Sequence, residues 1–342
     1  MKKVFSFAKN YLNYGMIAIV AIVFALLSTT GGLMMSNQLL LEKITIAIIL
    51  AVSLSMVVGF LGELSLGHAG FMCVGAFVGG KVAALLEPTL GNSFLLLLIS
   101  LLVGSLTAAL FGIIVGLPAL RLRGDYLAIV TLAFGEIVRS VVMNVPATLF
   151  GGTLGLPTPR FSRKYLFIIG FALVLACLAV TQNLIKSKHG RAITSIRDNE
   201  IAARAMGIDV TKYKLTVFTI SAFFAGVAGV LFSFSVNNVQ STSFDYNYSI
   251  EILVMVVLGG MGSINGSIIA ATLITFLTVT LQKYLTGDLA VLQNLLYALI
   301  LIVIVIYKNA PGLKFFREKY NLHTLFSKKD KKAAATDAKE EA

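Results

Sequence analysis

Long apolar runs alternate with short polar segments along almost the entire chain. Ten of these runs approach the roughly 20 residues that an α-helix needs to cross ~30 Å of hydrocarbon. They are 14–35, 44–61, 67–86, 93–117, 126–146, 165–183, 215–236, 249–261, 264–282 and 291–307. Apolar residues are continuous within each run and do not alternate with polar ones, which is typical of membrane helices and not of membrane strands. The sequence therefore predicts an all-α integral membrane protein, a polytopic bundle of about ten transmembrane helices.

The positions of lysine and arginine orient these spans. If the N-terminus is cytoplasmic, the segments 1–13, 118–125, 184–214 and 308–342 all fall on the cytoplasmic side. They hold 21 of the 28 basic residues, whereas the loops on the other side hold five. Basic residues concentrate in cytoplasmic loops of membrane proteins. The asymmetry predicts that both termini are cytoplasmic and that 184–214 is the central cytoplasmic loop.

Composition supports a lipid environment for most of the chain. It is 57% hydrophobic and 13% charged, about half the charged share of a soluble domain. We expect an N-terminal segment, 1–39, that carries the first span, a core over 40–312, and a basic cytoplasmic tail over 313–342 whose end is disordered. The first run also resembles a secretory signal peptide, but it lacks a clean cleavage motif, so we expect a retained helix. The basic residues that give the net charge of +12 lie mostly outside the spans, and this placement favours a bilayer over a nucleic acid as partner.

Residues 198–208 in the central loop predict a short helix with both ends marked. Asp198 or Asn199 can accept a hydrogen bond from the first backbone N–H groups, and Glu200 suits the positive end of the helix dipole. Gly207 supplies the left-handed conformation that commonly ends a helix.

The predicted helix has a face suited to a partner. Ile201, Ala205 and Ile208 are spaced to lie together, and Ala202 with Ala203 permits close backbone approach. The pattern fits a docking element on the cytoplasmic side, and it equally fits a surface helix lying on lipid headgroups.

Glu136 and Arg139 are charges inside a predicted span, where each costs ~3 kcal/mol on insertion scales. Three residues apart on a helix, they can form an ion pair. A gating or proton-relay role is one interpretation, and an ion pair that fixes helix packing is the other.

Two glycine-rich breaks, at 59–70 and 259–266, each follow one span and precede the next. Paired glycine interruptions indicate a transport path, although close packing of helices through small residues also explains them. The residues expected along the path are Ser65, Gly67, His68, Gly259, Gly260 and Asn265. Neither the two cysteines nor the three histidines are spaced for a metal site.

Five segments follow one another in a family-specific order. They are GELSLGHAGFMCVGAF at 62–77, GLPALRLRG at 116–124, GDYLAIVTLAFGEIVR at 124–139, RAITSIRDNEIAARAMGIDVTKYKL at 191–215 and VLGGMGSINGSIIAA at 257–271. Together they resemble the M-type permease of bacterial high-affinity branched-chain amino acid transporters, a family of ABC importers. The resemblance covers residues 40–312, which are therefore expected to form a permease core.

The resemblance implies a multi-pass protein of the bacterial cytoplasmic (inner) membrane that works with other subunits. These are a second homologous permease, two cytoplasmic ABC ATPases and an extracytoplasmic amino-acid-binding protein. The sequence contains no G-x-x-x-x-G-K-[ST] loop, so no cofactor is expected in this chain, and ATP and Mg are expected on the partner ATPases. The chain is then a transport subunit and not an enzyme.

The resemblance also implies that the 198–208 helix couples the permease to an ATPase. Importers of this kind carry the signature Glu-Ala-Ala, three residues, then Gly, which Ala202, Ala203 and Gly207 match. Ile201 stands where the signature has Glu, and Glu200 lies one residue earlier. The residues assigned to coupling are Asp198, Asn199, Glu200, Ile201, Ala202, Ala203, Ala205, Gly207 and Ile208.

Three other functions remain open at this point. Related permeases of the same family carry urea or short amides. An ion-coupled secondary transporter could use Glu136 and Arg139, and a membrane scaffold would have no path at all. Leu, Ile or Val is the expected cargo, because a path for an aliphatic side chain can be largely apolar.

Overall fold

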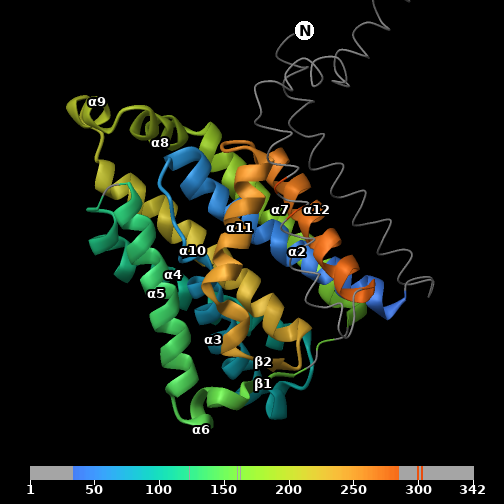
Figure 1. Cartoon of the computed structure of the whole chain (residues 1–342). Coiled ribbons are helices and arrows are strands. Elements are labelled where there is room, and N and C mark those ends of the chain that lie inside the picture. The colour runs from blue at the N-terminus through green and yellow to red at the C-terminus, as the bar shows by residue number, and fades with distance from the viewer. Residues whose placement is uncertain are drawn as a thin grey trace, which may run out of the picture. The chain divides into compact units, whose positions relative to one another are not determined.

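The computed structural model describes residues 34–122, 124–159, 161 and 163–284, together with the isolated helical positions 299 and 302. The chain divides into two compact units, Met1–Val279 and Thr280–Ala342, and the first holds the features discussed below except the last residues of helix α12 (Ile264–Tyr284). Its long elements are helices (Figure 1), as expected where the bilayer offers backbone groups no hydrogen-bond partner.

Seven described helices are long and apolar enough to cross a membrane. The first is α2 (Met35–Ser55) extended by the π-helical turn η1 (Met56–Leu61). The others are α3 (His68–Leu90), α4 (Phe94–Ala119), α5 (Asp125–Asn144), α7 (Arg163–Lys186), α10 (Val210–Ser235) and α12 (Ile264–Tyr284). They support a multi-pass, predominantly helical membrane protein and match seven of the predicted runs.

The predicted run at 249–261 is the shorter helix α11 (Tyr246–Gly259). Its 14 residues rise about 21 Å, less than the ~30 Å of a hydrocarbon core. The runs at 14–35 and 291–307 lie almost entirely outside the described residues, as do the tail at 313–342 and both termini. The total of ten spans and the cytoplasmic position of the termini therefore stay predictions.

Helix α2 lies at the centre of the first unit and packs against α7, α10 and α11. Its side chains from Ala47 to Leu54 are all buried, which is typical of a helix that is apolar on every side. Helix α10 packs against α2, α3 and α4. The core of the bundle is therefore formed by α2, α3 and α10.

Glycines bring α3, α4 and α10 into backbone contact. A Cβ at Gly75 would lie 2.5 Å from the Cα of Gly226, and a Cβ at Gly226 would lie 2.5 Å from the Cβ of Ala108. A Cβ at Gly229 would collide with the carbonyl oxygen of Met72. The three helices thus meet with almost no side chain between their backbones, as small residues allow in membrane bundles.

The outer helices α4, α5 and α12 expose large apolar side chains. Large exposed apolar patches mark surfaces that contact lipid or another protein. Examples are Leu95, Leu98, Leu102, Leu106, Ile129, Ile137, Val141, Ile269, Leu273 and Phe276. The surface of the first unit thus fits an apolar environment.

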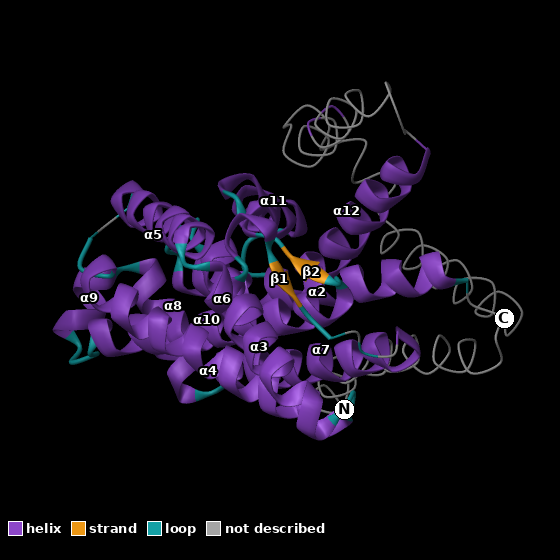
Figure 2. Ribbon diagram, turned by 90° about the horizontal axis from the view of Figure 1, so that it is seen from below, coloured by secondary structure: helices purple, strands orange, loops and turns teal. Residues whose placement is uncertain are grey.

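One end of the first unit carries short connecting elements, visible at the bottom of Figure 1 and from that side in Figure 2. Strand β1 (Leu156–Pro157) pairs antiparallel with β2 (Asn238–Val239), with Leu156 opposite Val239. The remaining elements there are α6 (Ala147–Phe150) and the 3-10 turns η2 (Gly152–Leu154) and η3 (Ser241–Phe244).

Candidate functional site

The central loop between α7 and α10 folds into two helices at the opposite end of the unit from the strands (Figure 1). Helix α8 (Lys188–Asp198) buries Ile193 and Ile196, which are 3% and 4% exposed. It packs against α7, η1 and α10. Helix α8 was not predicted from the sequence, because only a narrow stripe of this polar helix is apolar. Helix α9 (Glu200–Ala205) is shorter than the predicted 198–208.

The N-terminus of α9 is capped by Asn199 and not by Asp198. The Asn199 side-chain oxygen accepts a hydrogen bond from the backbone N–H of Ala202 at 3.0 Å, while the extended backbone of Asn199 separates α9 from α8. Asp198 ends α8 instead, and its carboxylate pairs with the Arg197 guanidinium at 3.0 Å. Gly207 adopts a φ of 81°, the left-handed conformation predicted for it.

Helix α9 presents an exposed apolar knob. Ile201 is 74% exposed and Met206 is 83% exposed, whereas Ala203 is buried. Ala202 and Ala205 are exposed as well. We call Ile201, Ala202, Ala205 and Met206 the α9 knob.

Ile208 does not join this knob, contrary to the prediction from spacing. The helix ends at Ala205, and the left-handed Gly207 redirects the chain. Ile208 is half-buried and lines a cavity of about 470 Å³ with Asp209, Tyr213 and others. Met206 takes the place expected for Ile208.

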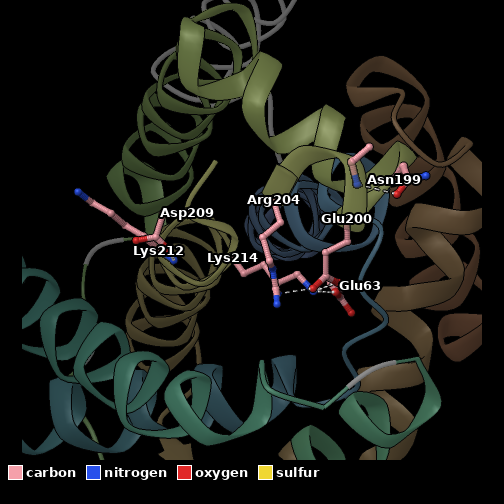
Figure 3. A network of polar contacts seen from close by, with 8 residues as sticks. Glu63, Asn199, Glu200, Arg204, Asp209, Lys212 and Lys214 are labelled. Carbon is pink, nitrogen blue, oxygen red and sulfur yellow. Dashed lines mark hydrogen bonds and ion pairs between the residues drawn. The ribbon is translucent and has the colours of Figure 1, made fainter. Parts of the chain in front are cut away.

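A chain of charged side chains connects α9 to the first glycine break (Figure 3). Lys214, on the first turns of α10, is 3% exposed and its ammonium contacts the carboxylates of both Glu63 and Glu200. The Lys214–Glu200 distance is 3.1 Å, and Glu200 also pairs with Arg204 at 2.9 Å. A buried ammonium is tolerated only when it is paired in this way.

Glu63 and Lys214 were not predicted as site residues from the sequence. Glu63 lies in the motif quoted at 62–77, but its partner is 151 residues away. A weak signal was available, since Glu63 is a charge between two apolar runs and such residues are usually functional or paired.

Arg197 makes a second connection from the loop to the same region. Its guanidinium donates a hydrogen bond to the carbonyl oxygen of Gly59 in η1 at 3.2 Å. Its aliphatic stem lies over Gly62, where a Cβ would be 2.6 Å from the Arg197 Cγ. Both loop helices are therefore attached to the segment around the first break.

The two glycine breaks lie against each other. A Cβ at Gly59 would be 2.5 Å from the backbone nitrogen of Gly262. Within the second break, a Cβ at Gly259 would be 2.5 Å from the backbone nitrogen of Ser267. Gly260 has a φ of 101°, which favours glycine. Segments separated by some 200 residues in sequence are thus joined at one place.

Helix α3 begins inside the bundle. Residues 62–67 form no helix, and the Leu66 N–H donates to the Thr131 hydroxyl at 3.0 Å, well inside α5. The Ala69 N–H donates to the Ser249 hydroxyl of α11 at 3.1 Å. Hydroxyls of other spans thus satisfy backbone donors that an interrupted helix exposes, as transporter folds with broken helices require.

Ser65, Gly67 and His68 occupy this interrupted segment. Ser65 and His68 are each 2% exposed, and the His68 Nε2 lies 2.8 Å from the Ser53 hydroxyl of α2. Gly67 is so close to the Thr131 carbonyl that a Cβ would not fit. The structure therefore gathers these three predicted residues where α2, α3 and α5 meet.

Asn265 lies in a different setting. It lines an open depression of about 190 Å³ together with Phe60, Gln182, Lys186 and residues of the second break. Neither Ser65 nor His68 lines that depression. The predicted path residues thus form two groups, which are linked through the contact between the glycine breaks.

Glu136 and Arg139 form the ion pair expected from their spacing. The Arg139 Nη2 lies 2.8 Å from the Glu136 Oε2, and each side chain is 29% exposed. The pair is contained within α5, and the other Glu136 carboxylate oxygen, Oε1, is buried without a hydrogen-bond partner among the described residues. Its gating and packing interpretations both remain predictions.

Metal chemistry finds no support in the part of the chain that the structure describes. No three His, Cys, Asp or Glu side chains gather there as a possible metal site. Cys73 and Cys177 are both buried and unbridged.

Comparisons with known proteins agree with the resemblance of the sequence motifs. The family model described as "Branched-chain amino acid transport system / permease component" matches residues 37–306. The high-affinity branched-chain amino acid transport system permease protein LivM of Salmonella typhimurium is 37% identical over 260 residues, 67% of this chain and 60% of that protein. LivM of Escherichia coli gives the same values. The match thus spans 60% of the length of these two relatives.

More distant relatives broaden the picture. A probable LivM of Methanocaldococcus jannaschii is 25% identical over 303 residues, 76% of this chain and 88% of that protein. A ribose import permease protein, RbsC, of Haemophilus influenzae is 31% identical over 131 residues, 36% of this chain and 40% of that protein. No solved structure matches. Since the family model extends from the first turn of α2 to residue 306, the chain belongs to the family of branched-chain amino acid transport system permease components.

Proposed function

We propose that this chain forms the translocation path of an ATP-driven importer for branched-chain amino acids in a bacterial inner membrane. The observation that carries the proposal is the family match over residues 37–306, which includes both glycine breaks and the α9 knob. The names of the LivM relatives support Leu, Ile or Val over the urea and short-amide alternatives. The match to the ribose permease covers about a third of this chain, so ribose is a useful control solute.

In this proposal the α9 knob docks on a cytoplasmic ATPase. A short helix with exposed Ile201 and Met206 is suited to fill a groove on another protein. The seven basic residues of 184–214 support a cytoplasmic position for this end of the bundle. ATP and Mg then bind to the ATPases, while a second permease and an extracytoplasmic binding protein complete the importer.

The path runs past the two glycine breaks. The interrupted start of α3 at His68 and the break at Gly260 place non-helical backbone inside a membrane bundle. Such backbone is found where it lines a cavity or is covered by protein. The non-helical backbone supplies polar groups for the charged amino and carboxylate groups of the transported amino acid. The aliphatic side chain of that amino acid needs only apolar walls.

Uptake into vesicles containing the complete complex tests the proposal. We expect accumulation of radiolabelled leucine that needs ATP and the binding protein and is blocked by vanadate. Gly207→Pro is expected to abolish it, because proline cannot adopt the positive φ at this position. Accumulation by this chain alone, driven by a proton or sodium gradient, would instead establish a secondary transporter.

Bulky substitutions test the path itself. Ser65→Leu is expected to lower uptake per assembled complex by roughly tenfold or more, equivalent to about 1.4 kcal/mol of barrier. Ser100→Leu is the matched control, because Ser100 is equally buried but lies on α4 outside both breaks. Normal uptake by an assembled Ser65→Leu complex would remove Ser65 from the path.

A further inference from the structure

Four charged side chains form an unbroken series from α9 to the first glycine break. Arg204 pairs with Glu200, Glu200 with Lys214, and Lys214 with Glu63. Figure 3 shows these side chains converging, while Lys212 and Asp209 point away from them. The series holds two positive and two negative charges.

Burial along the series is greatest at Lys214 and least at Arg204. The Arg204 side chain is 60% exposed, the Glu200 side chain 23%, the Glu63 side chain 13% and the Lys214 side chain 3%. Exposed ion pairs contribute little, whereas buried ones hold their partners strongly in place. The series is therefore held loosely at Arg204 on the α9 surface and most firmly at Lys214, which Glu63 contacts.

We propose that Lys214 is a positioning residue that transmits movement of α9 to the first glycine break, an inference that rests on the proposed function. Its ammonium lies between one carboxylate on α9 and one on the break. Helix α9 has little buried surface besides Ala203, so displacement by an ATPase acts on Glu200. Lys214 passes the displacement to Glu63, one residue beyond the left-handed Gly62 where the chain turns away from η1.

Arg197 supports the same connection from α8. It holds the Gly59 carbonyl, and Gly59 packs on Gly262 of the second break. A displacement of the loop helices therefore reaches both breaks through two separate cations. An apolar side chain would occupy this buried position at the start of α10 with a lower desolvation penalty than a lysine. A role in transmitting movement accounts for the lysine there.

The test compares uptake with ATP hydrolysis in vesicles that contain the full complex and its binding protein. Lys214→Met keeps the length of the side chain but removes the cation between Glu63 and Glu200, while Arg204 can still pair with Glu200. We expect ATPases to copurify and hydrolyse ATP, because the α9 knob is intact, while leucine uptake per ATP falls about tenfold or more. Lys214→Arg keeps a cation between the two carboxylates, and we expect it to retain most of the ratio.

Lys212→Met is the matched control, since Lys212 lies on the same helix two residues earlier but is exposed and outside the series. Its uptake per ATP is expected to equal that of the parent complex. If Lys214→Met leaves the ratio of uptake to ATP hydrolysis unchanged, whether or not both rates fall, Lys214 is only structural and the inference is overturned. The ratio is the decisive readout, because loss of folded complex reduces both rates together.

A milder variant covers the case in which Lys214→Met does not assemble. Glu63→Gln removes the charge on the break while keeping the Lys214–Glu200 pair, and the same fall in uptake per ATP is expected. An unchanged ratio in an assembled Glu63→Gln complex also overturns the inference. If the parent chain copurifies with no ATPase, the proposed function fails, and the inference fails with it. If the parent complex couples uptake to ATP hydrolysis and the variants have the same uptake per ATP, only the inference fails.

Discussion

Replacing both Ile201 and Met206 with aspartate is expected to release the ATPases from the permease. These side chains are 74% and 83% exposed and form the apolar part of the α9 knob. Apolar anchors at the centre of an interface typically contribute about 2 kcal/mol or more each, and a buried unpaired aspartate adds a further cost. The expected result is at least roughly a hundredfold weaker association, measured by copurification and titration of the ATPase.

The control for this prediction is Leu154→Asp. Leu154 is 79% exposed and lies in η2, at the opposite end of the unit from α9 (Figure 1). The substitution also replaces an exposed apolar side chain with aspartate, but at a place where no ATPase is proposed to dock. Association with the ATPase should therefore not change. Wild-type association of the Ile201 and Met206 double variant would show that docking takes place elsewhere.

Adding a single methyl group at Gly229 is expected to destabilise the bundle severely. The Cβ of Gly229→Ala would collide with the Met72 carbonyl and lie 2.8 Å from the Ala76 nitrogen. Both atoms belong to the backbone of α3, so α3 and α10 must separate. Overpacking of this kind costs about 3 kcal/mol, and it is expected to lower the midpoint of thermal unfolding in detergent and the yield of folded protein.

Gly135→Ala is the matched control in a helix. A Cβ at Gly135 would be 3.7 Å from its nearest neighbour, the Gly70 nitrogen, which is ordinary contact. Alanine also favours a helix over glycine by about 1 kcal/mol. Equal effects of the two substitutions would contradict the close contact between α3 and α10.

Continuous hydrophobicity predicted the described spans well, because lipid imposes a helix on any long apolar segment. The α9 caps also followed from local rules, although Asn199 and not Asp198 serves as the cap. Helix α8 was missed because its two buried isoleucines contact protein that is distant in sequence. Local patterns carry no information on such partners.

The candidate site depended on tertiary contacts in the same way. Each glycine break was visible in the sequence, but the packing of Gly59 on Gly262 was not. The pairing of Lys214 with Glu63 joins residues 151 positions apart, and no spacing rule covers that separation. The sequence therefore identified the glycine breaks and the helix around 200–205, whereas Glu63, Lys214 and the contacts between these parts came from the fold.

The short helix α11 determines where a polar solute has the least hydrocarbon to cross. Fourteen residues leave roughly 9 Å of the usual thickness without helix, next to the turn at Gly260–Ser263. Peptide groups at that depth need water or protein as hydrogen-bond partners. We therefore expect the permeability barrier to be thinnest beside α11 and hydration to penetrate the bundle there first.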